Sequence, residues 1–141
     1  MKIIALVGAQ NVGKTATLLE LISIVKKAGG SEIESSIKYG GGTLLNYKGH
    51  RIGITTEGDT GDIQEMNCDF FKKNRCDVMF TATRTRGATV DTVYTLAEEL
   101  SATLIWAAKS YYAINTTAKP NRIQFNTMNK LEAQFLFNMI D

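Results

Sequence analysis

The 141-residue sequence is poor in the residues that mark disulfide-rich, metal-binding or membrane-spanning proteins. Its two cysteines, Cys68 and Cys76, match no metal-binding or redox spacing, so we expect free thiols in a reducing compartment, with a single disulfide as the alternative. No apolar run approaches the roughly 20 residues that a membrane span requires. A strand is expected as early as residue 3, which predicts no signal peptide and a cytoplasmic protein without a membrane partner.

An excess of either charge is also lacking. The chain carries 16 basic and 14 acidic residues, a formal net charge of +2, which does not by itself indicate a nucleic-acid partner. Hydrophobic residues make up 44% and charged residues 21%, as in an ordinary globular protein with a buried core. The length suits one domain over residues 1–141, and no repeat or low-complexity tract divides it.

The most informative segment that is present covers residues 8–15, GAQNVGKT, which has the spacing G-x-x-x-x-G-K-T. It follows the apolar, β-branched run 3–7, which predicts a buried strand. After it, residues 16–27 carry apolar side chains at helical spacing, and Gly29-Gly30 marks the stop. Strand, glycine loop and helix in this order predict a phosphate-binding site, and a chance glycine-rich turn is the alternative.

Each residue type in this segment has an expected role. The glycines allow backbone N–H groups to turn inward, and the new helix points its positive end at the same spot. Lys14 is expected to reach the outer phosphates and to act in catalysis, and the Thr15 hydroxyl to ligate Mg²⁺. The expected nucleotide contacts in this segment are Gly8, Gln10, Asn11, Val12, Gly13, Lys14, Thr15 and Ala16. The sequence therefore predicts a protein that binds a nucleoside triphosphate or diphosphate.

The remaining sequence alternates strand and helix patterns. Two β-favouring runs around Lys48-Gly49-His50 predict a hairpin, and hence a mixed sheet. A last helix is expected with Met128, Leu131, Phe135 and Met139 on its apolar face. The expected strands are 35–39, 43–47, 51–56, 77–82 and 102–107, and the expected helices are 63–73, 90–100 and 123–140. This order predicts an α/β three-layer sandwich, with a mostly parallel sheet of five to six strands, one hairpin and helices on both faces.

Two further turns are expected at the carboxyl edge of that sheet, where such folds bind ligands. After the strand that ends at Thr56, Asp59 is expected to hold Mg²⁺, because Gly58 lets the backbone turn back toward Thr15. Glu57 is expected to orient an attacking water or hydroxyl. The alternative for both acids is a solvated turn. Asp62 is expected to cap the following helix.

The second turn is basic and follows the strand that ends at Ala82. Arg84 and Arg86 are suited to stabilise the oxygens of a transferring phosphoryl group, and their alternation predicts that one of them faces the site. An exposed basic loop is the alternative. Lys109, directly after the last strand, is expected to contact the base of the nucleotide, with a solvated lysine as the alternative.

The residues Gly8 to Thr15 resemble the phosphate-binding loop of the P-loop NTPase superfamily. This resemblance implies a P-loop nucleotide-binding domain that uses Mg²⁺. The hairpin before Glu57 is similar to that of Ras-like small GTPases, but D-x-x-G is absent. Where those proteins read guanine with Asn-Lys-x-Asp, this chain has Ala108-Lys109-Ser110-Tyr111, so ATP is expected in preference to GTP. Small P-loop kinases resemble the chain in size and in their arginines.

These observations predict Mg²⁺-dependent binding and hydrolysis of a nucleoside triphosphate. The alternatives are a kinase acting on a small molecule or nucleotide, a GTPase-like switch module that changes partners with the bound nucleotide, and a binding module without turnover. A small-molecule acceptor is a possible partner in the kinase interpretation. A homodimer is open as well, since a neighbouring subunit can supply an arginine to such a site.

Overall fold

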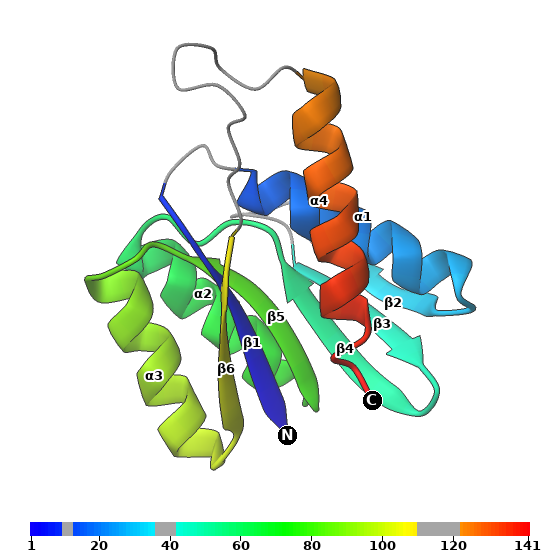
Figure 1. Cartoon of the computed structure of the whole chain (residues 1–141). Coiled ribbons are helices and arrows are strands. Elements are labelled where there is room, and N and C mark those ends of the chain that lie inside the picture. Colours follow the sequence, from blue (N-terminus) through cyan, green and yellow to red (C-terminus); the bar gives the residue numbers. More distant parts are fainter. Residues whose placement is uncertain (10–12, 36–41, 110–121) are drawn as a thin grey trace, which may run out of the picture.

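The computed structural model describes residues 1–9, 13–35, 42–109 and 122–141, with the backbone alone at 34–35 and 122–125. Strands and helices alternate along most of the chain (Figure 1). The strands are β1 (Lys2–Val7), β2 (Ser31–Ser35), β3 (Gly42–Tyr47), β4 (His50–Thr55), β5 (Val78–Thr83) and β6 (Thr103–Ala108). The helices are α1 (Lys14–Lys27), α2 (Gly61–Lys73), α3 (Ala88–Leu100) and α4 (Arg122–Phe137).

The six strands form one sheet in the order β2-β3-β4-β5-β1-β6. Strands β4, β5, β1 and β6 run parallel to one another, whereas β3 is antiparallel to both β2 and β4. The expected hairpin is confirmed as β3–β4, closed by Lys48 and Gly49, which both have positive φ (50° and 81°). Two consecutive positive φ values give a turn whose twist matches that of the strands it joins.

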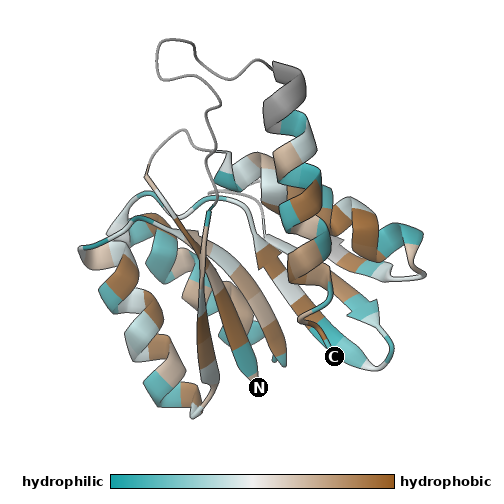
Figure 2. Ribbon diagram, viewed as in Figure 1, coloured by the Kyte–Doolittle hydropathy of each residue, from teal (hydrophilic) through white to brown (hydrophobic). Residues whose placement is uncertain are grey.

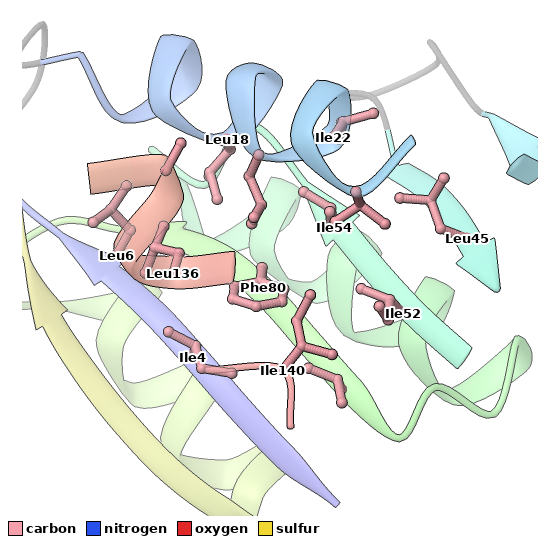
Figure 3. Packing of buried hydrophobic residues seen from close by; sticks show 14 of the residues in the cluster. Ile4, Leu6, Leu18, Ile22, Leu45, Ile52, Ile54, Phe80, Leu136 and Ile140 are labelled. Atoms are coloured by element: carbon pink, nitrogen blue, oxygen red, sulfur yellow. The ribbon is translucent and has the colours of Figure 1, made fainter. Parts of the chain in front are cut away.

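Helices cover both faces of the sheet and confirm the expected α/β sandwich (Figure 1). Alternate strand residues point to opposite faces, so Ile4 packs under α1 and α4 while Ile3 packs under α2 and α3. The apolar residues of each face form one buried cluster. The cluster under α1 and α4 joins Leu18 of α1 and Leu136 of α4 to Phe80 of β5 (Figure 3). Figure 2 shows the apolar residues concentrated along the strands, while each helix mixes apolar and polar residues. The central strands are thus fixed by burial on both faces.

The apolar face expected for the last helix is wrong for Leu131 and Phe135, whereas Met128 is partly buried and Met139 packs against the core. Leu131 and Phe135 are 67% and 58% exposed, and the buried residues of this C-terminal segment are Asn129, Ala133, Leu136 and Ile140. The two sets are interleaved on the same helical period, so spacing alone favoured the larger side chains. Leu131 and Phe135 instead line a groove of about 490 Å³ between α4 and β6, together with Trp106. None of the described helices combines the length and apolar character needed to cross a bilayer.

A smaller difference concerns the bounds of β2, whereas the expectation of two free cysteines is confirmed. Strand β2 begins at Ser31, four residues before the expected strand 35–39, and residues 36–39 of that prediction lie outside the described part of the chain. Strand β2 lies at the edge of the sheet, next to β3. An edge strand can form without alternating apolar and polar residues, so the sequence indicated the bounds of β2 only weakly. Cys68 and Cys76 are both free and buried, and burial raises the pKa of each thiol to about 12.

Candidate functional site

The ends of three neighbouring strands lie together at the carboxyl edge of the sheet, as the sequence predicts. Val7 of β1 pairs with Thr83 of β5, and the Gly8 N–H donates to the Thr83 carbonyl (3.2 Å). The Thr15 hydroxyl, at the start of α1, donates to the carbonyl of Thr56, directly after β4 (2.9 Å). This hydrogen bond joins the glycine loop (residues 8–15) to the residue that directly precedes the acidic turn (residues 57–59).

Lys14 lies at the centre of this arrangement, with only 6% of its side chain exposed. Its ammonium donates to the carbonyls of Gly8 (2.5 Å) and Thr83 (3.0 Å), and lies 3.6 Å from the Asp59 carboxylate. Burial lowers the pKa of Lys14 below its usual 10.5, the Asp59 carboxylate acts in the opposite direction, and the charge of Arg84 adds to the lowering. The cost of burying the Lys14 ammonium is thus offset only in part by the Asp59 carboxylate.

The first turn of α1 adds a second source of positive potential. Its N-cap, Gly13, has φ 95° and no side chain that could accept a hydrogen bond, and the turn contains no acidic residue. The Thr17 N–H donates to the Gly13 carbonyl (2.9 Å), which begins the helical pattern. N–H groups ahead of that bond have no partner within the helix, and the helix dipole favours an anion there.

A cleft of about 420 Å³ lies between α1 and the acidic turn. Its lining combines six of the predicted site residues with four others: Gly13, Lys14, Thr15, Ala16, Leu19, Thr56, Glu57, Gly58, Asp59 and Ala82. The predicted contacts Gln10, Asn11 and Val12 lie outside the described residues. The cleft is therefore bounded by the loop and helix on one side and by two carboxylates on the other.

The acidic turn is held tightly against the sheet. A Cβ added to Gly58 would lie 1.9 Å from the Ala82 carbonyl oxygen, so only glycine fits here. The turn is also anchored by Asn67, whose Nδ2 donates to the Glu57 carbonyl (2.6 Å) and to Gln64 Oε1 (2.9 Å). Gly58 does not have a positive φ, so its role is to permit close approach rather than the chain reversal that the sequence suggested.

The oxygens that the sequence predicts to hold Mg²⁺ lie at this cleft. Thr15 and Asp59 both line the cleft, and Glu57 provides a further carboxylate. No group of three or more His, Cys, Asp or Glu side chains suited to a metal occurs among the described residues. Mg²⁺ needs no such cage, because it keeps several waters and is bound by one or two protein oxygens together with phosphate.

The basic turn lies beside the cleft and is not part of its lining. Arg84 and Arg86 are both exposed, as the alternative of an exposed basic loop requires. The Arg84 N–H donates to the Thr89 hydroxyl (3.1 Å), and its charge is near enough to lower the pKa of Lys14. Arg84 is thus near enough to act electrostatically on Lys14.

Lys109 is buried rather than solvated, so that alternative is wrong. Its ammonium lies 3.0 Å from Glu132 of α4, and its side chain has no exposed surface. The Lys109 N–H donates to the Val7 carbonyl (2.7 Å), which places the residue beside the glycine loop. Contact of Lys109 with a base stays a prediction.

Sequence reasoning missed the residues that α4 contributes. Asn129 lies against Gly13 and accepts a hydrogen bond from the Thr17 hydroxyl (3.2 Å), and Glu132 pairs with Lys109. The two positions are 112 and 23 residues from their partners in the chain, so no local pattern connects them. The sequence of α4 also gives no signal of its own, because Asn129 and Glu132 stand among several other polar residues of this helix.

Comparisons of the chain with protein-family models, with curated proteins and with solved structures find no match. The assignment of a function therefore depends on the residues of the site itself.

Proposed function

We propose that this chain binds a nucleoside triphosphate with Mg²⁺, ATP in preference to GTP, and hydrolyses the terminal phosphoryl group. The observation that carries the proposal is the environment of Lys14. A buried ammonium with a lowered pKa lies at the end of a glycine-containing loop, beside a helix N-terminus that has no side-chain cap. Burying a charge is costly unless it is compensated, and a polyphosphate would compensate both the ammonium and the helix dipole.

The surrounding groups have complementary roles. Backbone N–H groups of the loop and of the first turn of α1 would hold the phosphates, with Lys14 on the outer ones. Thr15 and Asp59 would hold Mg²⁺, which when bound neutralises charge on the phosphate oxygens. A water oriented by Glu57 would attack the terminal phosphorus while the bond to the bridging oxygen breaks. The water's proton would pass to the released phosphate, and the products would be the nucleoside diphosphate and inorganic phosphate. The charge of Arg84 would favour the oxygens of the transferred group.

The resemblance to the P-loop NTPase superfamily supports the same proposal. The spacing G-x-x-x-x-G-K-T lies between a buried parallel strand, β1, and the start of α1. The preference for ATP follows from Ala108 and Tyr111, which stand where guanine-reading proteins of this kind have Asn and Asp.

Replacing Lys14 tests the proposal directly. We expect Lys14→Ala to weaken Mg-ATP binding by at least about 100-fold in isothermal titration calorimetry, because the main cation of the phosphate site is lost. Lys27→Ala, which removes an exposed lysine from the other end of α1, is the matched control and should bind within about twofold of the parent. Lys14→Ala that folds cooperatively and binds Mg-ATP as the parent does would refute the assignment.

Turnover needs its own measurement. We expect release of inorganic phosphate and formation of ADP from ATP, faster than from GTP, in the absence of any acceptor. ADP formation that requires an added small molecule would instead identify a kinase. Bound nucleotide without turnover above background would identify a binding module.

A further inference from the structure

One polar side chain of α4 reaches the glycine loop. Asn129 is 7% exposed, and the rest of the buried face of this C-terminal segment is apolar, with Ala133, Leu136 and Ile140 each at most 1% exposed. A buried amide costs free energy unless its polar atoms are paired. Oδ1 of Asn129 accepts a hydrogen bond from the hydroxyl of Thr17, which is itself fully buried (3.2 Å).

This hydrogen bond connects α4 to the beginning of α1. The Thr17 N–H donates to the Gly13 carbonyl (2.9 Å), so Thr17 is bonded to the loop through its backbone and to α4 through its side chain. Gly13 also lies directly beneath the amide. A Cβ built on Gly13 would lie 2.8 Å from Oδ1 and 3.3 Å from Nδ2 of Asn129. The Asn129 amide thus occupies the space that a side chain at position 13 would need.

The same helix also contacts Lys109, the residue that follows β6. Glu132, one turn further along α4, pairs with Lys109 at the end of β6, and the Lys109 N–H donates to Val7 at the end of β1. Two polar residues of α4 therefore contact the end of the glycine loop at Gly13 and the residue that follows β6, Lys109. Contacts that fix a loop in its binding geometry lower the entropy lost when a ligand binds.

We propose that Asn129 is a positioning residue of the glycine loop, which holds Gly13 and the first turn of α1 in the geometry that binds phosphate. The inference rests on the proposed function for its ligand. The neutral side chain matters because the amide lies next to the expected position of a polyanion. An aspartate has nearly the same shape and can still accept from Thr17, but it would place a negative charge beside the phosphates.

The deciding experiment compares Asn129→Asp with Asn126→Asp, which adds the same charge to an exposed position of α4. We expect Asn129→Asp to weaken Mg-ATP binding by about tenfold or more, with a smaller loss for ADP and a loss that shrinks at high salt. Asn126→Asp should change the affinity by less than about twofold. A role of Asn129 in folding alone predicts equal losses for ATP and ADP at every salt concentration. Parental binding by folded Asn129→Asp, or equal losses for the two nucleotides, would therefore overturn the placement of this amide beside the phosphates.

A second measurement keeps the inference independent of nucleotide binding. In Asn129→Ala without nucleotide, we expect the amides of residues 17–19, the first that are bonded within α1, to exchange hydrogen faster than in Asn126→Ala, while residues 20–27 of α1 keep their protection. Unchanged exchange at 17–19 would refute the positioning role. If the parent protein fails to bind ATP while exchange at 17–19 responds as expected, the proposed function is wrong and the positioning role of Asn129 stands.

Discussion

The two connections that meet at the cleft, β1 to α1 and β4 to α2, begin their helices in opposite ways. At α2, the Thr60 hydroxyl accepts from the Ile63 N–H (3.2 Å), and Asp62 lies in the first turn. At α1, Gly13 offers no capping side chain, the first turn has no acid, and Lys14 is the first helical residue. The start of α2 is capped by a side chain of its own chain, whereas the start of α1 has neither a capping side chain at Gly13 nor an acid in its first turn.

The glycines of the two connections also differ in purpose. Gly13 has a positive φ, a conformation that other residues adopt only at a cost, whereas Gly58 is needed for space against the Ala82 carbonyl. Gly13 is thus required by its backbone conformation, and Gly58 by close packing. The two connections are joined by the hydrogen bond from Thr15 to Thr56.

The largest effect is expected from Gly58→Ala. The new methyl group would meet the Ala82 carbonyl at 1.9 Å, so the acidic turn has to move away from β5. We expect the free energy of unfolding, measured in urea, to fall by about 2–3 kcal/mol. Gly61→Ala, at the start of α2, is the control. Its methyl group would lie 3.1 Å from the Ala88 methyl group and would not meet a carbonyl oxygen. Equal stability of the two variants would show that Gly58 is not fixed by packing.

A smaller effect is expected when α1 is made to resemble α2. Ala16→Glu places an acid in the first turn of α1, at an exposed position that lines the cleft. We expect Mg-ATP affinity to fall about tenfold while stability without nucleotide rises by about 0.5 kcal/mol, since the acid interacts with the helix dipole.

Asp62→Ala is the reciprocal change at α2. It should lower stability by about 0.5 kcal/mol and leave Mg-ATP affinity within about twofold. Equal losses of affinity in Ala16→Glu and Asp62→Ala would remove the distinction between the two helix starts.

The smallest effect concerns protons bound by Lys14. Because burial holds its pKa below 10.5 when folded, the unfolded chain binds more protons between the folded pKa and 10.5. The contribution of Lys14 to the free energy of unfolding should therefore rise with pH across this window. Bound phosphate favours the ammonium, so Mg-ATP binding in the same window should take up a fraction of a proton.

Calorimetry at alkaline pH, in two buffers of different ionisation heat, measures that uptake. Lys14→Arg keeps the charge and does not titrate in this range, so its uptake should vanish. The same uptake in Lys14→Arg would assign the proton to another group.

The features that depend on residues close together in the sequence were the ones that the sequence predicted best. The apolar run before Gly8, the hairpin around Gly49 and the order of strands and helices all follow from local periodicity and turn residues, and each was confirmed. Asp62 was expected to cap α2, but the cap is Thr60, since either residue could begin a helix and only the backbone angles decide (φ −127°, ψ 156° at Thr60).

Contacts between distant segments were not predictable in this way. Nothing local connects Asn129 to Gly13, and the close approach of Gly58 to Ala82 depends on the pairing of β4 with β5. The exposed Leu131 and Phe135 were assigned to the core because helical spacing fits two overlapping faces of α4, and only the packing against α1 selects one.

The groove between α4 and β6 has a practical consequence. Trp106, the single tryptophan of the chain, lies there at 41% exposure beside Leu131 and Phe135. Indole emission shifts to longer wavelength when neighbouring apolar groups are replaced by water. The intrinsic fluorescence of the unlabelled protein should therefore report whether α4 is seated on the sheet, the same helix that carries Asn129 to the glycine loop.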